Sequence, residues 1–411
     1  MSRCLPGKTH RRERWQLVRK LNVSIAKIMK RYGNLWCKVI AEDNLYTAIK
    51  KACRSNGRIS PCKKAAINRI KENPEKYVKQ LRMILSQNKY KTSHYYIYPL
   101  YEPKLRLIYC LPFYPDRIVH HAIMNVMESI WDNMMLPDSY ACRKGKGQHR
   151  GGTKAAQYVR KYKYCLQCDI SQFYVNINHE ILKNILRRKI KDRQLLDVLY
   201  EIIDSCCTRD KNLKILYKML RRGSTSKDVP VEILKLSKSK AADGNSKAGL
   251  PIGNYVSQWF GNIYLNELDR FIKQELLAKG YVRYCDDFVI FSNDKAELQI
   301  WKQSIKTWMW QHLHLQYSRA ETFPTAQGVD FLGYRYFPQG YVLLRKRTAK
   351  RMRRRINELP TKLKVGKISK EKAIAQIASA KGWLRWAKTY HFRRRIGLEK
   401  LEKEVRMSET F

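Results

Sequence analysis

Long apolar runs are absent from this chain of 411 residues: no segment approaches the ~20 apolar residues that a membrane-spanning helix requires. Residues 1–15 are basic and polar, so no secretory signal is expected there. Internal repeats and low-complexity tracts are also missing. These absences argue against a membrane span and a repeat architecture, and we expect a cytoplasmic protein with no membrane partner.

Cysteine is present but lacks the arrangement of a disulfide framework. The 11 cysteines are scattered and odd in number, which fits a reducing compartment. Cys165 and Cys168 form a Cys-x-x-Cys, yet they fall in the stretch 164–170, which reads as a buried strand. Side chains alternate between the two faces of a strand, whereas zinc would need both thiols on one side. We therefore interpret them as core cysteines rather than zinc ligands.

Acidic residues are scarce: 35 Asp and Glu stand against 83 Lys and Arg, which gives a net charge of +48. A compact chain this basic repels itself unless an anionic partner neutralises it. Nucleic acid is the expected partner, because neutralising each phosphate also releases condensed counterions. With 44% hydrophobic residues, the chain is globular and long enough for two or three domains.

Alternating hairpin-like strands and separate helices predict an α+β fold. Asn73-Pro74 and Ser60-Pro61 each place a capping side chain before a proline suited to the first helical position. Helices are expected over most of 1–90, and over 116–135, 178–190, 252–274, 294–313 and from 345 almost to the end. Strands are expected over 94–100, 105–112, 164–170, 281–284, 288–292, 329–337 and 341–344. The basic, polar segment 208–247 is expected to be a surface excursion.

Tyr284-Cys285-Asp286-Asp287-Phe288 is the sharpest local feature. Two adjacent carboxylates at the tip of a predicted hairpin repel each other and add nothing to packing. A divalent cation removes that repulsion, and Mg²⁺ prefers carboxylate oxygens. Read alone, the segment is more often a simple Asp-rich turn, so its weight depends on another carboxylate elsewhere.

Asp169 ends the predicted strand 164–170, and Tyr174 follows five residues later. Two-metal phosphoryl transfer needs carboxylates from separate elements that converge on one point. Asp169 together with the Asp286-Asp287 pair meets that need; the alternative for Asp169 is a turn or helix-initiating carboxylate. Tyr174 is either a core aromatic or a wall that excludes a ribose 2′-hydroxyl.

The segment from Gly249 to Gly253 precedes a predicted helix that carries Ser257 and Gln258. Paired glycines before a helix let the backbone approach a ligand closely. Candidate clamps for a triphosphate are Lys104, Arg106, Arg117 and, in the glycine-rich loop 143–147, Arg143. In so basic a chain, each of these is alternatively a solvated surface group or a duplex contact.

The order of these motifs, followed by Gly328-Val-Asp-Phe-Leu-Gly-Tyr334, resembles that of the reverse transcriptases from about residue 94 to 390. The resemblance implies an RNA-directed DNA polymerase with a right-hand fold. The implied parts are a basic helical N-terminal extension (1–90), fingers (91–163), palm (164–340, with the excursion 208–247) and helical thumb (341–411). No RNase H or endonuclease domain is expected after the thumb.

The resemblance also implies roles for single residues. Asp169 and Asp286 would ligate two Mg²⁺ ions, for which Mn²⁺ can substitute, with the Ile170 carbonyl assisting and Asp287 supporting. Tyr174 would be the steric gate for dNTP substrates. The other implied nucleotide-binding residues are Lys104, Arg106, Arg143, Gly253 and Ser257. The primer grip would comprise Phe331, Leu332, Gly333 and Tyr334, and the thumb helices within 346–395 would hold the RNA/cDNA duplex. Trp383 and Trp386 are expected in the core rather than on a stacking surface.

One departure points to a subfamily. Reverse transcriptases related to group II introns carry Gln-Gly-x₃-Ser-Pro where this chain has Ile252-Gly253-x₃-Ser257-Gln258. The change is similar to that in diversity-generating retroelements, which copy a template-repeat RNA with errors at adenines for targeted sequence diversification. A template-side residue that loses its amide loses hydrogen bonds that support selectivity, so Ile252 and Gln258 are candidate fidelity residues. The resemblance further implies a small, basic, multimeric accessory variability protein as partner.

Two alternatives remain open. The chain could be a group II intron or retron-type reverse transcriptase of ordinary fidelity, or an RNA-binding protein that keeps a polymerase fold without catalysis. Three mutually repelling carboxylates, Asp169, Asp286 and Asp287, argue against the second alternative, because a binding protein does not need them.

Overall fold

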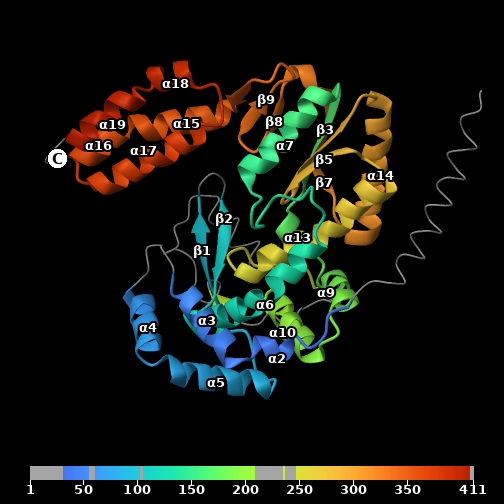
Figure 1. The fold of residues 1–411 in the computed structure, drawn as a ribbon, viewed down its shortest axis with the longest axis vertical. Helices are drawn as coiled ribbons and strands as arrows, with labels where there is room; N and C mark the ends of the chain where they lie inside the picture. The colour runs from blue at the N-terminus through green and yellow to red at the C-terminus, as the bar shows by residue number, and fades with distance from the viewer. Residues whose placement is uncertain (1–30, 55–60, 102–104, 209–234, 237–246, 408–411) are drawn as a thin grey trace, which may run out of the picture. The chain divides into compact units, whose positions relative to one another are not determined.

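The computed structural model describes residues 31–54, 61–101, 105–208, 235–236 and 247–407 (Figure 1). Contacts group the chain into two compact units, each assembled from three segments. The first comprises Met1–Leu136, Ser171–Glu275 and Trp308–Gln316, and the second Pro137–Ile170, Leu276–Thr307 and Tyr317–Phe411. The expected division into extension, fingers, palm and thumb stays a prediction.

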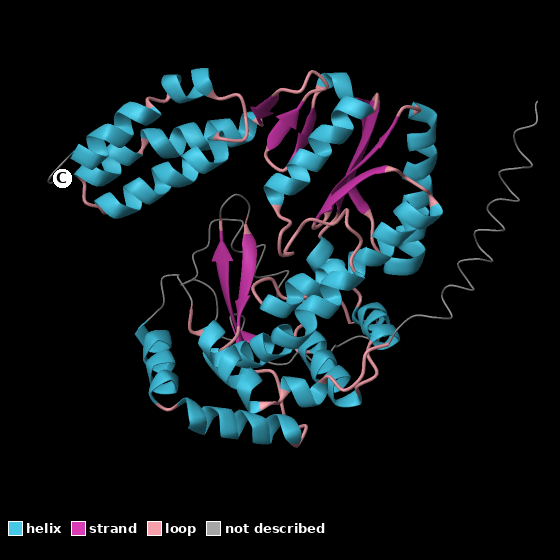
Figure 2. Cartoon of the chain, in the orientation of Figure 1, coloured by secondary structure: helices cyan, strands magenta, loops and turns pink. Residues whose placement is uncertain are grey.

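Helices dominate the first unit (Figure 2). They are α2 (Trp36–Val39), α3 (Glu42–Ala52), α4 (Pro61–Glu72), α5 (Pro74–Ser86), η2 (Phe113–Arg117), α6 (Ile118–Met134), α8 (Phe173–Asn176), α9 (His179–Lys189), α10 (Arg193–Asp204), α13 (Tyr255–Arg270) and η3 (Phe271–Glu275). The core is formed where α6 meets α13, with the Trp131 ring centroid 6.2 Å from that of Trp259 and 6.0 Å from that of Phe260. The strands β1 (Tyr95–Leu100) and β2 (Arg106–Cys110) form an antiparallel hairpin, which β4 (Lys235–Leu236) joins.

The second unit is built on a four-stranded antiparallel sheet in the order β5-β6-β3-β7. Its strands are β3 (Tyr164–Ile170), β5 (Gly280–Tyr284), β6 (Asp287–Ser292) and β7 (Tyr317–Pro324). Helix α7 (Gln148–Lys161) contacts β5 and β6, and also the small sheet β10-β9-β8. That sheet comprises β8 (Val329–Phe331), β9 (Tyr334–Tyr336) and β10 (Val342–Leu344).

Helix α14 (Lys295–Leu313) begins in the second unit, and its residues from Trp308 onward belong to the first. Apart from the short η4 (Thr325–Gln327), the remaining helices of the second unit lie in its C-terminal part. They are α15 (Lys346–Asn357), α16 (Leu359–Lys364), α17 (Lys370–Leu384), α18 (Tyr390–Arg395) and α19 (Leu398–Met407). Their apolar side chains, among them Ile356, Leu359, Ile377 and Leu398, form one buried cluster. None of the helices in the described ranges is both long and apolar enough to cross a membrane.

The antiparallel sheets and separate helices agree with the predicted α+β class. The strand predicted over 164–170 matches β3, and Asn73 caps α5 ahead of Pro74 as expected. The turn at 102–104 and most of the excursion 208–247 lie outside the described residues.

Three expectations were wrong or incomplete. The segment 329–337 is two strands rather than one, because Leu332 and Gly333 adopt positive φ angles and reverse the chain. The helix predicted from 252 begins at Tyr255. Strand β7 and helices α7 and α10 were not predicted; β7 has a mixed, half-buried pattern that gave no clear two-residue period.

Two helical glycines provide a matched test of packing in the second unit. A Cβ added at Gly152 of α7 would lie 2.2 Å from the Tyr336 hydroxyl, whereas one added at Gly382 of α17 would meet nothing within 4 Å. We expect Gly152→Ala to destabilise the fold by about 1–3 kcal/mol through overpacking. Gly382→Ala should stabilise it by up to about 1 kcal/mol, because alanine favours the helix. Thermal unfolding of both variants measures this, and equal effects would contradict the packing of α7 on β9.

Candidate active site

Four side chains form a row across the main sheet of the second unit. Strand register pairs Tyr284 of β5 with Asp287 of β6, Asp287 with Asp169 of β3, and Asp169 with Arg319 of β7. Directly paired residues on neighbouring antiparallel strands have Cβ atoms about 4.5–5.5 Å apart and point to the same face. The sheet therefore brings Asp169 and Asp287 together, although 117 residues separate them in sequence.

Asp286 lies in the tight turn that joins β5 to β6. Because Tyr284 pairs with Asp287, the loop contains only Cys285 and Asp286. Cys285 has a φ of +54°, in the left-handed region that two-residue hairpins demand. The fully buried Arg283 donates from Nη1 to the Cys285 carbonyl at 3.1 Å. This bond supports a strained turn that carries two carboxylates.

A β-bulge adjusts the position of Asp169. Strand β7 pairs Arg319 with Asp169 and Tyr317 with Ile170, so Ser318 is the extra residue. The Ser318 hydroxyl lies within hydrogen-bond distance of both the Asp169 carbonyl (3.2 Å) and its carboxylate Oδ2. Bulges are common beside active sites, where they re-aim a side chain. Ser318 and Arg319 were not identified from the sequence, because their strand was not predicted.

The carboxylate of Asp287 is unfavourable in its charged form, because it is buried and lies near the charge of Asp169. Its Oδ1 is buried and accepts no hydrogen bond from the described residues. Burial, and after it the charge of Asp169, raise the pKa of Asp287 to about 7; Arg319 and Arg345 act in the opposite direction. A cation bound beside these carboxylates would supply the missing partner of Oδ1 and offset the repulsion.

This donor set fits a hard divalent cation. Asp169 and Asp287 supply carboxylate oxygens from the neighbouring strands β3 and β6, and Asp286 supplies them from the turn between β5 and β6. Such oxygens are the ligands that Mg²⁺ prefers. In the described ranges, no three His, Cys, Asp or Glu side chains are placed so that they could hold a metal ion as they stand. Asp169, Asp286 and Asp287, together the carboxylate row, are the residues that would hold a cation. Ile170 follows Asp169 on β3.

The predicted basic loop lies beside the carboxylate turn. Ser139 forms a β-bridge with Arg283, which places the segment just before this loop along β5. A hydrogen bond from Cys285 lowers the pKa of Cys142 to about 7, so the two thiols are in contact. Arg143 follows directly and donates from Nη1 to the Ser139 carbonyl at 3.1 Å. The backbone at Arg143 therefore lies one residue from a thiol that contacts the carboxylate turn.

The predicted primer-grip residues form the turn between β8 and β9. Phe331 pairs with Tyr334, which leaves Leu332 and Gly333 as a two-residue loop. Gln148 donates to the Leu332 carbonyl at 2.8 Å, and the Tyr334 ring stacks on Trp383 at 5.4 Å. Helices on both sides therefore fix the shape of this turn.

Trp383 of α17 and Trp386, which lies in the turn after that helix, differ in burial. Trp383 is partly buried and packs against both apolar clusters of the second unit, as predicted. The prediction that Trp386 is a core residue was wrong: it is 48% exposed and stacks on His149 at 4.4 Å. Cys165 and Cys168 are both buried in β3, which confirms them as core cysteines.

In the first unit, the glycine motif is a tightly held loop. Gly253 has a φ of +127°, and a Cβ there would lie 2.5 Å from the Tyr109 carbonyl of β2. The Tyr109 N–H donates to the Ile252 carbonyl at 2.8 Å. Ser257 is buried in the first turns of α13, and Gln258 beside it is exposed. Glycine at 253 is thus required by both its φ angle and this close approach.

Tyr174 is linked to the same loop. Its carbonyl accepts a hydrogen bond from the Leu250 N–H at 2.8 Å. Its ring lies against Gly261 of α13, where an added Cβ would be 3.3 Å from the Tyr174 hydroxyl. Arg106 and Arg117 are exposed in the same unit, and Lys104 lies outside the described residues.

Comparison with known proteins identifies related sequences. Residues 99–336 match the family model described as reverse transcriptase (RNA-dependent DNA polymerase). The matched range contains the carboxylate row, the glycine motif and the turn between β8 and β9.

Curated relatives are similar at low identity. Protein YkfC of Escherichia coli is 23% identical over 289 residues, covering 61% of this chain and 66% of that protein. Group II intron-encoded protein LtrA of Lactococcus lactis is 22% identical over 288 residues, covering 54% and 43%. Nuclear intron maturase 1, mitochondrial, of Arabidopsis thaliana is 22% identical over 222 residues, covering 47% and 29%. The chain spans less than two thirds of the length of each of these relatives.

The raised pKa of Asp287 predicts a pH dependence of stability without divalent cations. Between about pH 4 and 7 the folded chain keeps a proton on Asp287 that the unfolded chain has released, so the free energy of unfolding falls as pH rises. Asp287→Asn removes this slope. We expect the variant to gain roughly 1–4 kcal/mol over the unmodified protein between pH 4 and pH 8.

Chemical unfolding in EDTA at several pH values measures the effect. Asp197→Asn, at an exposed position of α10, is the matched control and should leave the slope unchanged. If the free energy of unfolding varied with pH in the same way for the Asp287 variant and the unmodified protein, a raised pKa of Asp287 would be contradicted. Adding Mg²⁺ should stabilise the unmodified protein more than the variant.

Proposed function

This chain belongs to the reverse transcriptase (RNA-dependent DNA polymerase) family, and on that basis we propose that it makes cDNA on an RNA template at the carboxylate row of β3 and β6. The observation that carries the proposal is the pairing of Asp169 with Asp287 across neighbouring strands, beside Asp286 in the turn. A buried, unpartnered Oδ1 on Asp287 weakens the fold unless a cation or another donor joins it. Catalysis explains why such a row is present at all.

We assign the metal-holding role to Asp169 and Asp286, with the Ile170 carbonyl assisting and Asp287 supporting. Two Mg²⁺ ions, or Mn²⁺ in their place, would activate the primer 3′-hydroxyl and stabilise the charge on the leaving pyrophosphate. Ser318 orients the Asp169 carboxylate through its hydroxyl, and Arg283 holds the turn that presents Asp286. These contacts limit the movement of the carboxylates during the reaction.

Other residues are assigned to the dNTP and the nucleic acid. Arg143 lies beside the carboxylate turn and would hold phosphate oxygens. The remaining nucleotide contacts are proposed for Lys104, Arg106, Gly253 and Ser257, with Tyr174 as the steric gate. The basic helix α15 buries Met352 and Ile356 and exposes most of its Lys and Arg side chains, which suits the phosphates of a template–product duplex.

The first experiment is primer extension on RNA by the purified full chain with dNTPs and Mg²⁺. We expect synthesis that Asp286→Asn and Asp169→Asn each reduce by at least about a thousandfold, because each removes a charged cation ligand. The matched control Asp197→Asn should retain full activity. RNA affinity should survive in all three variants, since binding depends on the basic surface.

RNA binding without synthesis by the unmodified protein would support the alternative of a non-catalytic binding protein. Synthesis that persists in the Asp169 variant would contradict the assignment of the carboxylate row.

We further propose that the enzyme belongs to a diversity-generating retroelement and copies its template-repeat RNA with errors opposite adenine. The supporting feature is Ile252, whose apolar side chain stands where group II intron-like enzymes carry glutamine. The half-buried Ile252 is anchored through its carbonyl on β2, so its side chain has a defined position. A small, basic, multimeric accessory protein would be the partner.

The alternative is an ordinary group II intron-type or retron-type enzyme. The names of two relatives, a group II intron-encoded protein and an intron maturase, favour it. The two functions differ in fidelity, because only the retroelement enzyme makes errors selectively opposite adenine.

Sequencing cDNA made on a mixed-sequence RNA separates these functions. For the retroelement enzyme we expect errors concentrated opposite template adenines, and about a tenfold reduction in Ile252→Gln, since the amide restores hydrogen bonds. The control Ile252→Leu keeps an apolar side chain and should keep the errors. Faithful cDNA from the unmodified protein, with and without a basic accessory protein, would exclude the retroelement assignment and leave the polymerase.

A further inference from the structure

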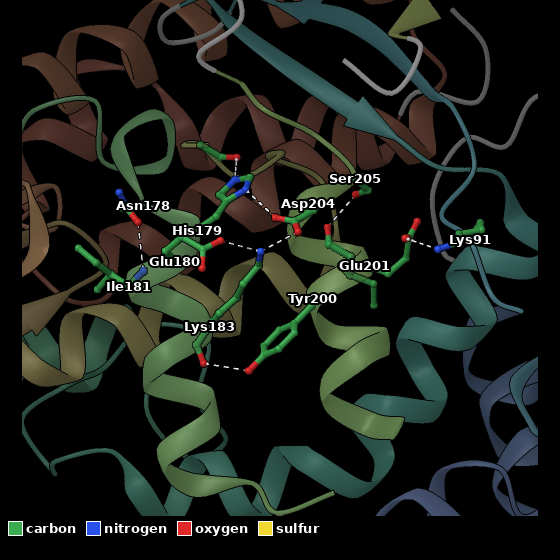
Figure 3. A network of polar contacts seen from close by, with 12 residues as sticks. Lys91, Asn178, His179, Glu180, Ile181, Lys183, Tyr200, Glu201, Asp204 and Ser205 are labelled. Atoms are coloured by element: carbon green, nitrogen blue, oxygen red, sulfur yellow. Dashed lines mark hydrogen bonds and ion pairs between the residues drawn. The ribbon is translucent and has the colours of Figure 1, made fainter. Parts of the chain in front are cut away.

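A buried histidine in the first unit contacts the glycine loop directly. The His179 side chain, at the start of α9, is completely inaccessible. Its Nε2 lies 2.9 Å from the Gly249 carbonyl, and its Nδ1 lies 3.2 Å from Oδ1 of Asp204 at the end of α10 (Figure 3). His179 was not singled out from the sequence, because a lone histidine before a helix carries no recognisable motif.

Both partners of the His179 ring are acceptors. A peptide carbonyl and a carboxylate have no hydrogen to donate, so both contacts are hydrogen bonds at once only when both ring nitrogens carry hydrogen. The carboxylate is that of Asp204, whose Oδ1 faces Nδ1. Lys183 shares the same carboxylate through Oδ2 at 2.6 Å and also contacts Glu180 at 2.9 Å. Burial alone would raise the pKa of Asp204, but its bonds to His179 and Lys183 hold that pKa below its usual value.

The Gly249 carbonyl belongs to a segment that sequence and geometry connect to the proposed nucleotide site. The Gly249 N–H donates to Ile177 at 2.8 Å, and the next N–H, of Leu250, donates to the carbonyl of Tyr174 at 2.8 Å. Gly249 has a φ of +98°, so the chain turns there before it reaches Ile252. The histidine thus holds the segment at its turn, between the proposed steric gate and the proposed fidelity residue.

We propose that His179 is a positioning residue for the polymerase reaction: through its bond to the Gly249 carbonyl it fixes the backbone of residues 249–253 against Tyr174. This inference rests on the proposed function for its kinetic consequences. Its structural consequence, that His179 keeps residues 249–253 ordered, can be tested without polymerase activity.

Two substitutions separate the two bonds of the ring. In His179→Gln the side-chain amide nitrogen takes the place of Nε2 and can still donate to Gly249. In His179→Asn it takes the place of Nδ1 and can donate only to Asp204. Each variant loses one of the two contacts of the ring, so both should be less stable. Lys183→Gln is the matched control, because Lys183 contacts Asp204 and Glu180 but not the loop.

Steady-state primer extension is the first readout. We expect His179→Asn to raise the KM for dNTP about tenfold, with a smaller change in kcat, since one hydrogen bond to a buried carbonyl is lost. His179→Gln and Lys183→Gln should keep the KM of the unmodified protein despite lower thermal stability. Equal KM values in the Asn and Gln variants would overturn the proposal and leave His179 a purely structural residue.

Hydrogen exchange of the amides of Gly249 and Leu250 is the second readout, and it needs no activity. These amides should exchange faster in His179→Asn than in His179→Gln, because the Asn variant releases the loop. Unchanged exchange in the Asn variant would overturn the proposal even if the enzyme is active. Absence of cDNA from the unmodified protein would count against the proposed function alone, and exchange would still decide the role of His179.

Discussion

Repulsion between Asp169 and Asp287 is the constraint on which the second unit depends. The two carboxylates face each other on adjacent central strands, where charges of one sign weaken a sheet. Arg319 on β7 lies at one end of the row, and burial, followed by the charge of Asp169, raises the pKa of Asp287. The paired carboxylates therefore make the sheet less stable than its apolar core alone would make it. The proposed metal site thus costs the sheet stability.

The surroundings of the row keep the carboxylates in place. The bulge at Ser318 aims a hydroxyl at Asp169, and the buried Arg283 holds the backbone of the turn at Cys285. Below the row, apolar residues from β3, β5 and β6 pack against α7. The carboxylates thus lie on a sheet that an apolar core holds in place. Such an arrangement suits the proposed reaction, which depends on the position of phosphates rather than on covalent chemistry by the protein.

In the first unit, backbone atoms rather than side chains organise the glycine motif. Carbonyls of Tyr174 and Ile252 each accept one bond that ties the loop to a neighbouring element, and the His179 ring adds a side-chain contact at Gly249. These backbone bonds do not involve the side chain of Ile252. The proposed role of Ile252 in fidelity is therefore separable from the geometry of the loop.

The sequence by itself determined the elements with a strong local signal. The strand ending at Asp169, the hairpin with Asp286 and Asp287 at its tip, and the capped helix at Pro74 follow from apolar runs, turn residues and caps that act over a few residues. Tertiary structure alone decided the partners. Strand order set Asp287 opposite Asp169, the bulge brought Ser318 to it, and packing buried His179 beside Gly249. Such contacts join residues far apart in the chain, and no local pattern encodes them because their free energy exists only once the sheet and helices have assembled.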